Sequence, residues 1–193
     1  MSLCAINSRP VICLQTDFDG GGLHVGYAAT HTPPSPTAWD FVSAHNWDDA
    51  GSSSVIATQE IDSVEVPIIS YLSNWGWHDL CYARPLVAEP TDFNDWHRVL
   101  HLDTHVSGIS LALADGRPLI GYYQTDEQEI RCAWARNAQP ADDTEWDYYT
   151  VCDGLTAEAL SVGVVSIHDI PMIAFVDDVQ DALIFGYLDE SEE

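Results

Sequence analysis

The feature that most constrains the fold of this chain is a short segment that occurs four times, about fifty residues apart. Each copy runs from a proline through an aliphatic residue, an isoleucine and a small residue to an aromatic residue in three copies and a leucine in the first. The copies are Pro10–Leu14, Pro67–Tyr71, Pro118–Tyr122 and Pro171–Phe175. Such a period is typical of repeat architectures, in which each unit buries its apolar face only against its neighbours.

Each copy predicts four β-strands. An apolar run and a polar turn precede the proline, and a third alternating segment follows about sixteen residues after it. These third segments are 23–28, 78–83, 130–135 and 183–188, and a fourth begins at Trp39, Trp96 and Trp146 but has no counterpart in the last copy. Alternation with period two and enrichment in Val, Ile, Tyr and Trp favour strands over helices. The aromatic residues of the third segments, Tyr27, Tyr82, Trp134 and Tyr187, are expected to be buried between sheets.

We therefore predict an all-β protein, a β-propeller of four blades in one domain over residues 1–193. The repeats cover about residues 1–50, 51–106, 107–158 and 159–193, and the last blade lacks its outer strand. The small residue after each isoleucine fits a position where a neighbouring blade presses close. Three arrangements remain open: a four-bladed ring closed by packing of blade faces, an arc completed by other subunits as a homo-oligomer, and another stacking of the sheets.

One part of the repeat resembles a known family. The segment SLALADGRPLIGYY (110–123), followed by IRCAWA (130–135), resembles a repeat of bacterial and archaeal surface proteins with propeller-like blades. It is also similar to the blades of sialidase-type and fucose-lectin-type propellers, although the Ser-x-Asp-x-Gly-x-x-Trp turn of sialidase blades is absent. The resemblance implies the fold and leaves the activity open, because propellers carry unrelated functions.

The charge of the chain excludes some partners. It has 31 Asp and Glu against 6 Arg and no Lys, a formal net charge of −25. Such a surface repels nucleic-acid phosphates and anionic lipid headgroups, so we expect neither nucleic acid nor membrane as a partner. Abundant salt, divalent cations or a basic partner must screen the carboxylates, and the composition resembles that of proteins from salt-loving organisms.

Neither a leader segment nor a cysteine framework is indicated. The first residues lack a basic start with an apolar run, and no stretch has eighteen apolar residues, which predicts a cytoplasmic or virion-associated protein. Five cysteines at unrelated spacings, with no Cys-x-x-Cys pair, indicate reduced thiols instead of disulfides or a zinc site.

Acidic residues mark the turns between the second and third strands. Asp17 and Asp19 in the first copy, and Asp177 and Asp178 in the last, are spaced so that they could chelate Ca²⁺ through carboxylate oxygens. The alternative is that Asp and Gly simply form hairpin turns. Because no segment matches a full calcium-binding loop, we expect no cofactor, with calcium as the exception to test.

The corresponding turn of the second copy contains Trp75, Trp77 and His78 in place of carboxylates. Two indoles on a loop offer a flat apolar surface for stacking a sugar or for contacting a protein. We therefore predict a ligand-binding site at these three residues, recognising a carbohydrate or a protein surface.

The sequence contains no nucleophile elbow, phosphate-binding loop or His-Glu-x-x-His motif. Pairs of carboxylates suited to glycoside hydrolysis can be drawn from so many Asp and Glu that none is informative. We therefore expect a non-catalytic binding or assembly module, lectin-like or structural, displayed on a virion or cell surface, with no catalytic residue assigned. The alternative is a glycosidase-like enzyme of the sialidase type.

Overall fold

The computed structural model describes residues 1–16, 22–46, 50–73, 78–155, 161–177 and 182–187, which form four antiparallel sheets. The first sheet contains β1 (Ser2–Ile6), β2 (Arg9–Thr16), β3 (Gly22–Ala28) and β4 (Trp39–His45). The second contains β5 (Ala50–Ile61), β6 (Val64–Ser73), β7 (Asp79–Pro85) and β8 (Trp96–Asp103). The third contains β9 (Val106–Ala114), β10 (Arg117–Gln124), β11 (Glu129–Ala135) and β12 (Trp146–Cys152), and the last contains β13 (Val162–Ile167), β14 (Ile170–Asp177) and β15 (Ala182–Tyr187).

The four sheets are structural copies of one another, as the repeat predicts. Ile12, Ile69, Ile120 and Ile173 all lie in the second strand of their sheets. Each pairs with an aliphatic residue of the first strand, which is Leu3, Ile56, Leu111 or Val164. On its other side each pairs with a small residue of the third strand, which is Gly26, Ala83, Ala133 or Gly186. The same register in all four copies confirms the repeat.

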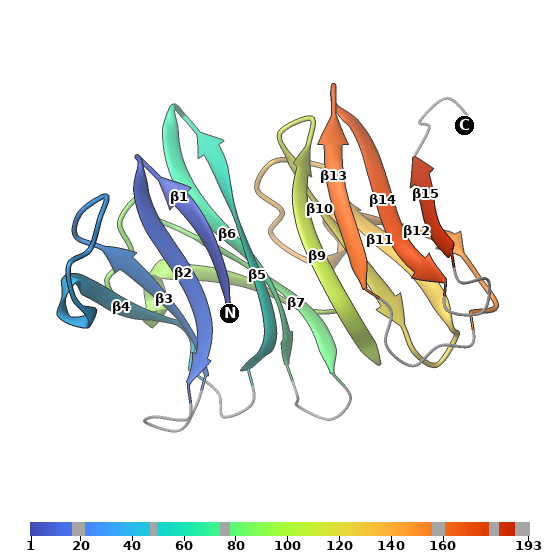
Figure 1. The fold of residues 1–193 in the computed structure, drawn as a ribbon, viewed down its shortest axis with the longest axis horizontal. Coiled ribbons are helices and arrows are strands. Elements are labelled where there is room, and N and C mark those ends of the chain that lie inside the picture. The colour runs from blue at the N-terminus through green and yellow to red at the C-terminus, as the bar shows by residue number, and fades with distance from the viewer. Residues whose placement is uncertain (17–21, 47–49, 74–77, 156–160, 178–181, 188–193) are drawn as a thin grey trace.

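The sheets stack face to face in chain order, with the first strands β1, β5, β9 and β13 side by side (Figure 1). Each interface is a hydrophobic core built from one face of a sheet and the opposite face of the next. Ile69 and Tyr71 face the first sheet, whereas Ile120 and Tyr122 face the second. Hydrogen bonds to serine side chains also link neighbouring first strands. Ser2 Oγ accepts the Ile56 N–H (3.3 Å), and Ser110 Oγ accepts the Val164 N–H (3.1 Å).

In the first three sheets, the small residue after the isoleucine lies where the next sheet presses. Cys13 and Ser70 are fully buried at this position. At Gly121 a Cβ atom would lie 2.4 Å from Val164 Cγ1 and 3.1 Å from Ile173 Cδ1 of the last sheet. The close approach of the sheets therefore depends on a small residue at this position, because protein interiors leave no spare volume.

The ring predicted from the sequence is not closed. The first and last sheets lie at opposite ends of the row (Figure 1). The structure therefore shows an all-β protein of four antiparallel sheets that do not close into a ring. Within the described residues, the last sheet has three strands, which agrees with the missing outer strand. Tyr187 is 69% exposed, contrary to expectation, because no sheet covers the outer face of β15. Tyr82 and Trp134 are buried as expected.

A short 3₁₀ turn precedes the fourth strand in the first three sheets, at Pro36–Ala38, Phe93–Asp95 and Asp143–Glu145. Asp92 and Asp142 cap two of these turns by accepting the N–H of the residue two positions later. All five cysteines are free thiols. In the part of the chain that is described, no helix is long and apolar enough to span a membrane.

Candidate functional site

Polar side chains gather at one end of the stacked sheets. Because successive strands are antiparallel, the turn after the second strand and the connection after the fourth strand leave each four-stranded sheet at the same end. In the second and third sheets this end contains Asp103, Glu127 and Glu129 with the buried side chains of Asp79 and Gln124. We call it the acidic end.

A β-bulge lies next to the acidic end in each four-stranded sheet. The pairing of the third and fourth strands shifts register at Leu23/His24, Leu80/Tyr82 and Ile130/Arg131. A bulge bends its strand and re-aims the side chains beyond it. In β8 the bulge is followed by Asp103, whose carboxylate reaches the third sheet.

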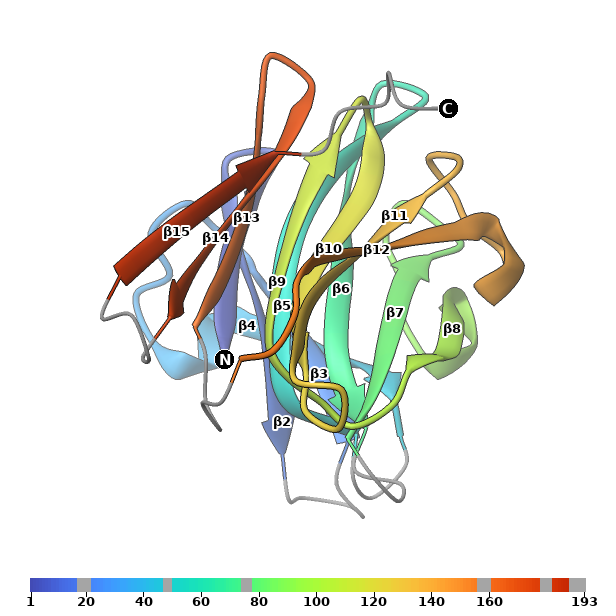
Figure 2. The ribbon, with the colours of Figure 1, turned by 90° about the vertical axis from the view of Figure 1, so that its right-hand side faces the viewer.

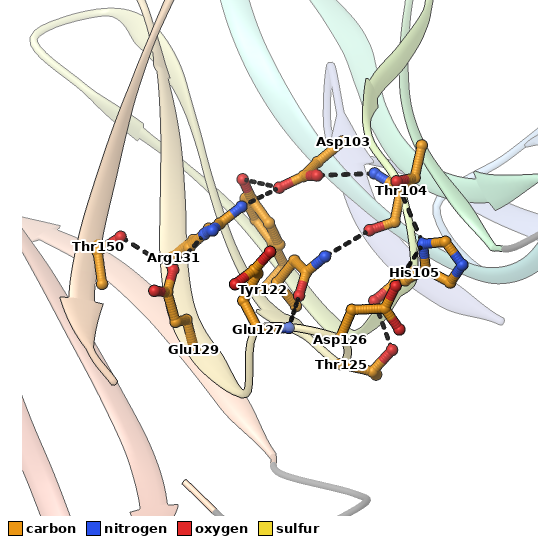
Figure 3. Close-up of polar contacts among 11 residues, drawn as sticks. Asp103, Thr104, His105, Tyr122, Thr125, Asp126, Glu127, Glu129, Arg131 and Thr150 are labelled. Carbon is orange, nitrogen blue, oxygen red and sulfur yellow. Dashed lines mark hydrogen bonds and ion pairs between the residues drawn. The ribbon is translucent and has the colours of Figure 1, made fainter. Parts of the chain in front are cut away.

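Asp103 is the centre of a polar cluster between the second and third sheets (Figure 3). The Tyr122 hydroxyl donates to Asp103 Oδ2 (2.9 Å), and Arg131 Nη1 donates to the same oxygen (3.2 Å). Arg131 Nε donates to Glu129 Oε2 (2.6 Å), which also accepts from Thr150 Oγ1 (3.1 Å). One guanidinium thus holds two carboxylates that come from different sheets, in an arrangement typical of a charge-assisted network.

The loops around the cluster are fixed by a second set of bonds. The Gln124 side chain donates to the Thr104 carbonyl (3.3 Å) and accepts the Glu127 N–H (2.6 Å). His105 Nδ1 lies 3.2 Å from the Asp126 carboxylate, and the backbone carbonyl of His105 accepts the N–H of Thr125 (2.8 Å). These contacts hold the turn between β10 and β11 against the connection between β8 and β9.

The environment fixes the protonation of two groups in the cluster. Burial, and then the charge of Asp103, raises the pKa of Tyr122, which therefore stays a hydrogen-bond donor at neutral pH. The hydrogen bond from Arg131 lowers the pKa of Glu129, which therefore stays a carboxylate. Glu129 is thus suited to accept a proton or attack a carbon, and poorly suited to donate a proton.

A groove opens beside this cluster. Its volume is about 270 Å³, and it is lined by Leu102, Asp103, Arg131, Tyr148, Tyr149 and Thr150. The volume lies near the lower limit of small-molecule sites, roughly 300–1,000 Å³, so it suits one ring better than an extended chain. Tyr148 and Tyr149 are 44% and 38% exposed, and they provide phenol rings next to a carboxylate and a guanidinium. Aromatic faces combined with charged hydrogen-bonding groups are suited to a sugar ring.

The residues predicted from the sequence are only partly described. Trp75, Trp77, Asp17, Asp19 and Asp178 lie outside the described residues, so the sugar or protein site and the calcium site stay predictions. His78 is exposed, and its carbonyl accepts the N–H of Val106 in the next sheet (3.0 Å). Asp177 is 3% exposed at the end of β14. Within the described ranges, no group of three or more His, Cys, Asp or Glu side chains is arranged to hold a metal.

A second depression lies near the opposite ends of the strands, between the first and second sheets. Two adjoining cavities of about 300 Å³ and 440 Å³ share Arg9, Tyr27, Ala28 and Glu89. The hydroxyl of Tyr27 is buried there without a hydrogen-bond partner in the described structure. This depression is larger than the Asp103 groove, but none of its lining residues forms a cluster of two carboxylates on one guanidinium.

Sequence comparison does not identify the chain, since neither a protein-family model nor a curated protein matches it. Solved structures do resemble it. A GH43_1 enzyme from Xanthomonas citri superposes with a TM-score of 0.54 at 12% identity, over 98% of this chain and 68% of that one. A thermostable family-43 glycoside hydrolase superposes with a TM-score of 0.49 at 14% identity, over 98% and 71%. At such identities the first similarity concerns the fold alone.

The first of these neighbours counts against the expectation of a non-catalytic binding or assembly module and favours the glycosidase-like alternative, because a structure that shares this arrangement of sheets is a GH43_1 enzyme. A missing sequence motif does not exclude catalysis, because glycoside hydrolysis requires only a few carboxylates that the fold brings together. Such residues leave no local signature.

Proposed function

We propose that the protein is a glycosidase-like enzyme that uses the groove beside Asp103 and Arg131 to act on a carbohydrate. The observation that carries the proposal is the single guanidinium of Arg131 holding Asp103 and Glu129 at the edge of an aromatic-lined groove. The fold shared with a family-43 glycoside hydrolase supports it by analogy. We further propose that the four sheets are consecutive blades of a propeller whose ring one chain does not complete.

We propose distinct roles for residues that line the groove and for Glu129 and Glu127, which do not line it. Glu129, kept ionised by Arg131, would be the base or nucleophile, and Arg131 would position it. The Tyr148 ring would stack on the sugar, and Asp103 would accept a sugar hydroxyl. We assign the proton donor to Glu127, an exposed residue whose backbone N–H donates to Gln124 Oε1 (2.6 Å). A donor and a base on separate carboxyl groups are what glycoside hydrolysis requires.

The test is hydrolysis of a panel of chromogenic aryl glycosides of pentoses and hexoses. We expect kcat/KM on the best substrate to fall by about 10²–10⁴-fold in Glu129→Gln and in Glu127→Gln, because each loses proton transfer or attack. Arg131→Met should also lower kcat/KM. Arg9→Met is the matched control, because it removes a guanidinium from the other depression and should leave the rate unchanged.

Two results would contradict this proposal. One is a wild-type protein that hydrolyses no member of the panel at high enzyme concentration. The other is hydrolysis that survives Glu129→Gln and Glu127→Gln but is lost in Arg9→Met, which would move the reaction to the other depression.

A further inference from the structure

The outer face of the last sheet is apolar and uncovered. The cross-strand register places ten residues on it: Gly163, Val165, Ile167, Ile170, Met172, Ala174, Val176, Leu183, Phe185 and Tyr187. Seven of them are large and between 37% and 69% exposed, and none is charged. Figure 2, viewed from this side, shows β13, β14 and β15 in front. We call this surface the last-sheet face, and a contiguous exposed apolar surface of this kind is typical of an interaction site.

The outer face of the first sheet is its counterpart. Leu3, Ile12 and Phe41 share this face through the register of β1 to β4, together with Leu14. Leu3 is 64% exposed and Phe41 52%, with the Phe41 ring lying against Gly26. We call it the first-sheet face, and none of the described residues of β1 to β4 that share it is a carboxylate.

These two faces are the two halves of an interface that the chain already forms three times. At the interface of the third and last sheets, Gly121 receives Ile173 and Val164 of the next sheet. At the interface of the first and second sheets, Cys13 shares a core with the corresponding Ile69 and Ile56. On the last-sheet face the small residue is Ala174, and no sheet presses on it. On the first-sheet face the corresponding isoleucine and aliphatic residue are Ile12 and Leu3, and no other described sheet packs on them.

We propose that copies of this chain associate head to tail, with the last-sheet face of one copy packed on the first-sheet face of the next. The contact is heterologous, so it continues the stack into a ring or an open chain of copies. It is independent of the proposed catalytic function. The net charge of −25 opposes association, and salt screens that repulsion while strengthening apolar contacts.

Sedimentation and light scattering between about 5 and 500 µM protein, at 0.1 and 2 M NaCl, test the proposal. We expect the weight-average mass of the wild type to rise at least twofold with concentration, and more readily at high salt. Leu3→Glu and Phe185→Glu should each remain monomeric. An equimolar mixture of the two should form a dimer and nothing larger, because each variant keeps one intact face. Val87→Glu, at a 46% exposed turn residue, adds the same charge and should associate like the wild type.

A wild type that is monomeric under all these conditions would overturn the proposal. So would a Leu3→Glu variant that still dimerises while Phe185→Glu does not, since that pattern means two last-sheet faces pair with each other. Leu3→Gln and Phe185→Gln repeat the mixing experiment without added charge. Formation of the mixed dimer also shows that both variants are folded.

Discussion

Gly121 offers the sharpest test of how the sheets pack. Its φ is not positive, so alanine can adopt its backbone conformation, and in open space Gly→Ala would stabilise the fold by about 0.4–1 kcal/mol through the unfolded chain. Here the new Cβ would lie 2.4 Å from Val164 Cγ1 and 3.1 Å from Ile173 Cδ1. Overpacking a well-packed core costs about 1–3 kcal/mol. We therefore expect Gly121→Ala to lose about 1–2 kcal/mol net, which lowers Tm by roughly 2–8 °C for a chain of this size.

Urea and thermal unfolding followed by circular dichroism provide the measurement. Gly163→Ala is the matched control, because it is also a strand glycine but its Cβ would meet nothing closer than 4.0 Å. It should be neutral or stabilising at low protein concentration. The double variant Gly121→Ala, Val164→Ala should lose less than the sum of its single variants, by about 1 kcal/mol or more, because the clash is removed. A neutral Gly121→Ala would refute the close packing of the third and last sheets.

Three further outcomes follow from the same contacts and charges. Tyr122→Phe should lower the free energy of unfolding in urea by about 1–2 kcal/mol, because Asp103 loses the hydrogen bond from the Tyr122 hydroxyl. An unchanged urea midpoint would show that this hydrogen bond is dispensable. Burial, and then Arg98, lowers the pKa of His45 from 6.5 to about 4. The unfolded chain therefore protonates His45 at a higher pH than the folded chain, so the free energy of unfolding should fall as the pH drops from about 6.5 to about 4. A His45→Gln variant whose free energy of unfolding falls equally over this range would disprove this. Tm should rise between about 0.05 and 1 M NaCl as the charge of −25 is screened, and a flat salt response would show that repulsion is unimportant.

The sequence was sufficient to predict the repeat and its strands, because the positions that pack between sheets carry the same residue types in every copy. Ile12, Ile69, Ile120 and Ile173 occupy the same register with the same neighbours. Closure of the ring could not be predicted, since it depends on the accumulated angle between sheets and on no single residue. The 3₁₀ turns were missed although Asp92, which accepts the Asn94 N–H, is a capping signal that the sequence contains.

The candidate site was missed for a different reason. Asp103 follows a bulge at the end of one sheet, whereas Tyr122 and Arg131 belong to the next, and a pattern read along one repeat does not reveal which residues meet between repeats. Regular spacing in the sequence is equally uninformative for His97, His101 and His105, which lie four residues apart. They contact the Ala141 carbonyl, Asp79 and Asp126 separately.

Comparing the copies position by position does distinguish scaffold from function. The residue pairs Tyr122–Arg131 and Gln124–Glu129 in the third sheet correspond to Phe175–Ile184 and Asp177–Ala182 in the last. The last sheet therefore folds with no guanidinium at the Arg131 position and no carboxylate at the Glu129 position. The last copy of the repeat therefore does not require these charges, which agrees with the roles that the proposed function gives to Arg131 and Glu129.

This reasoning predicts the result of converting one copy toward the other. The double variant Glu129→Ala, Arg131→Ile gives the third sheet the residues that the last sheet carries at these positions. Replacing the partly buried Glu129–Arg131 pair with apolar residues is often neutral in stability, but Asp103 also loses its Arg131 partner, so we expect the free energy of unfolding in urea to fall by about 1–3 kcal/mol. Hydrolysis of the best aryl glycoside should nevertheless be lost. If the variant instead unfolds while the residual folded fraction keeps full specific activity, the charges are part of the scaffold, and the groove between the second and third sheets is not the site of reaction.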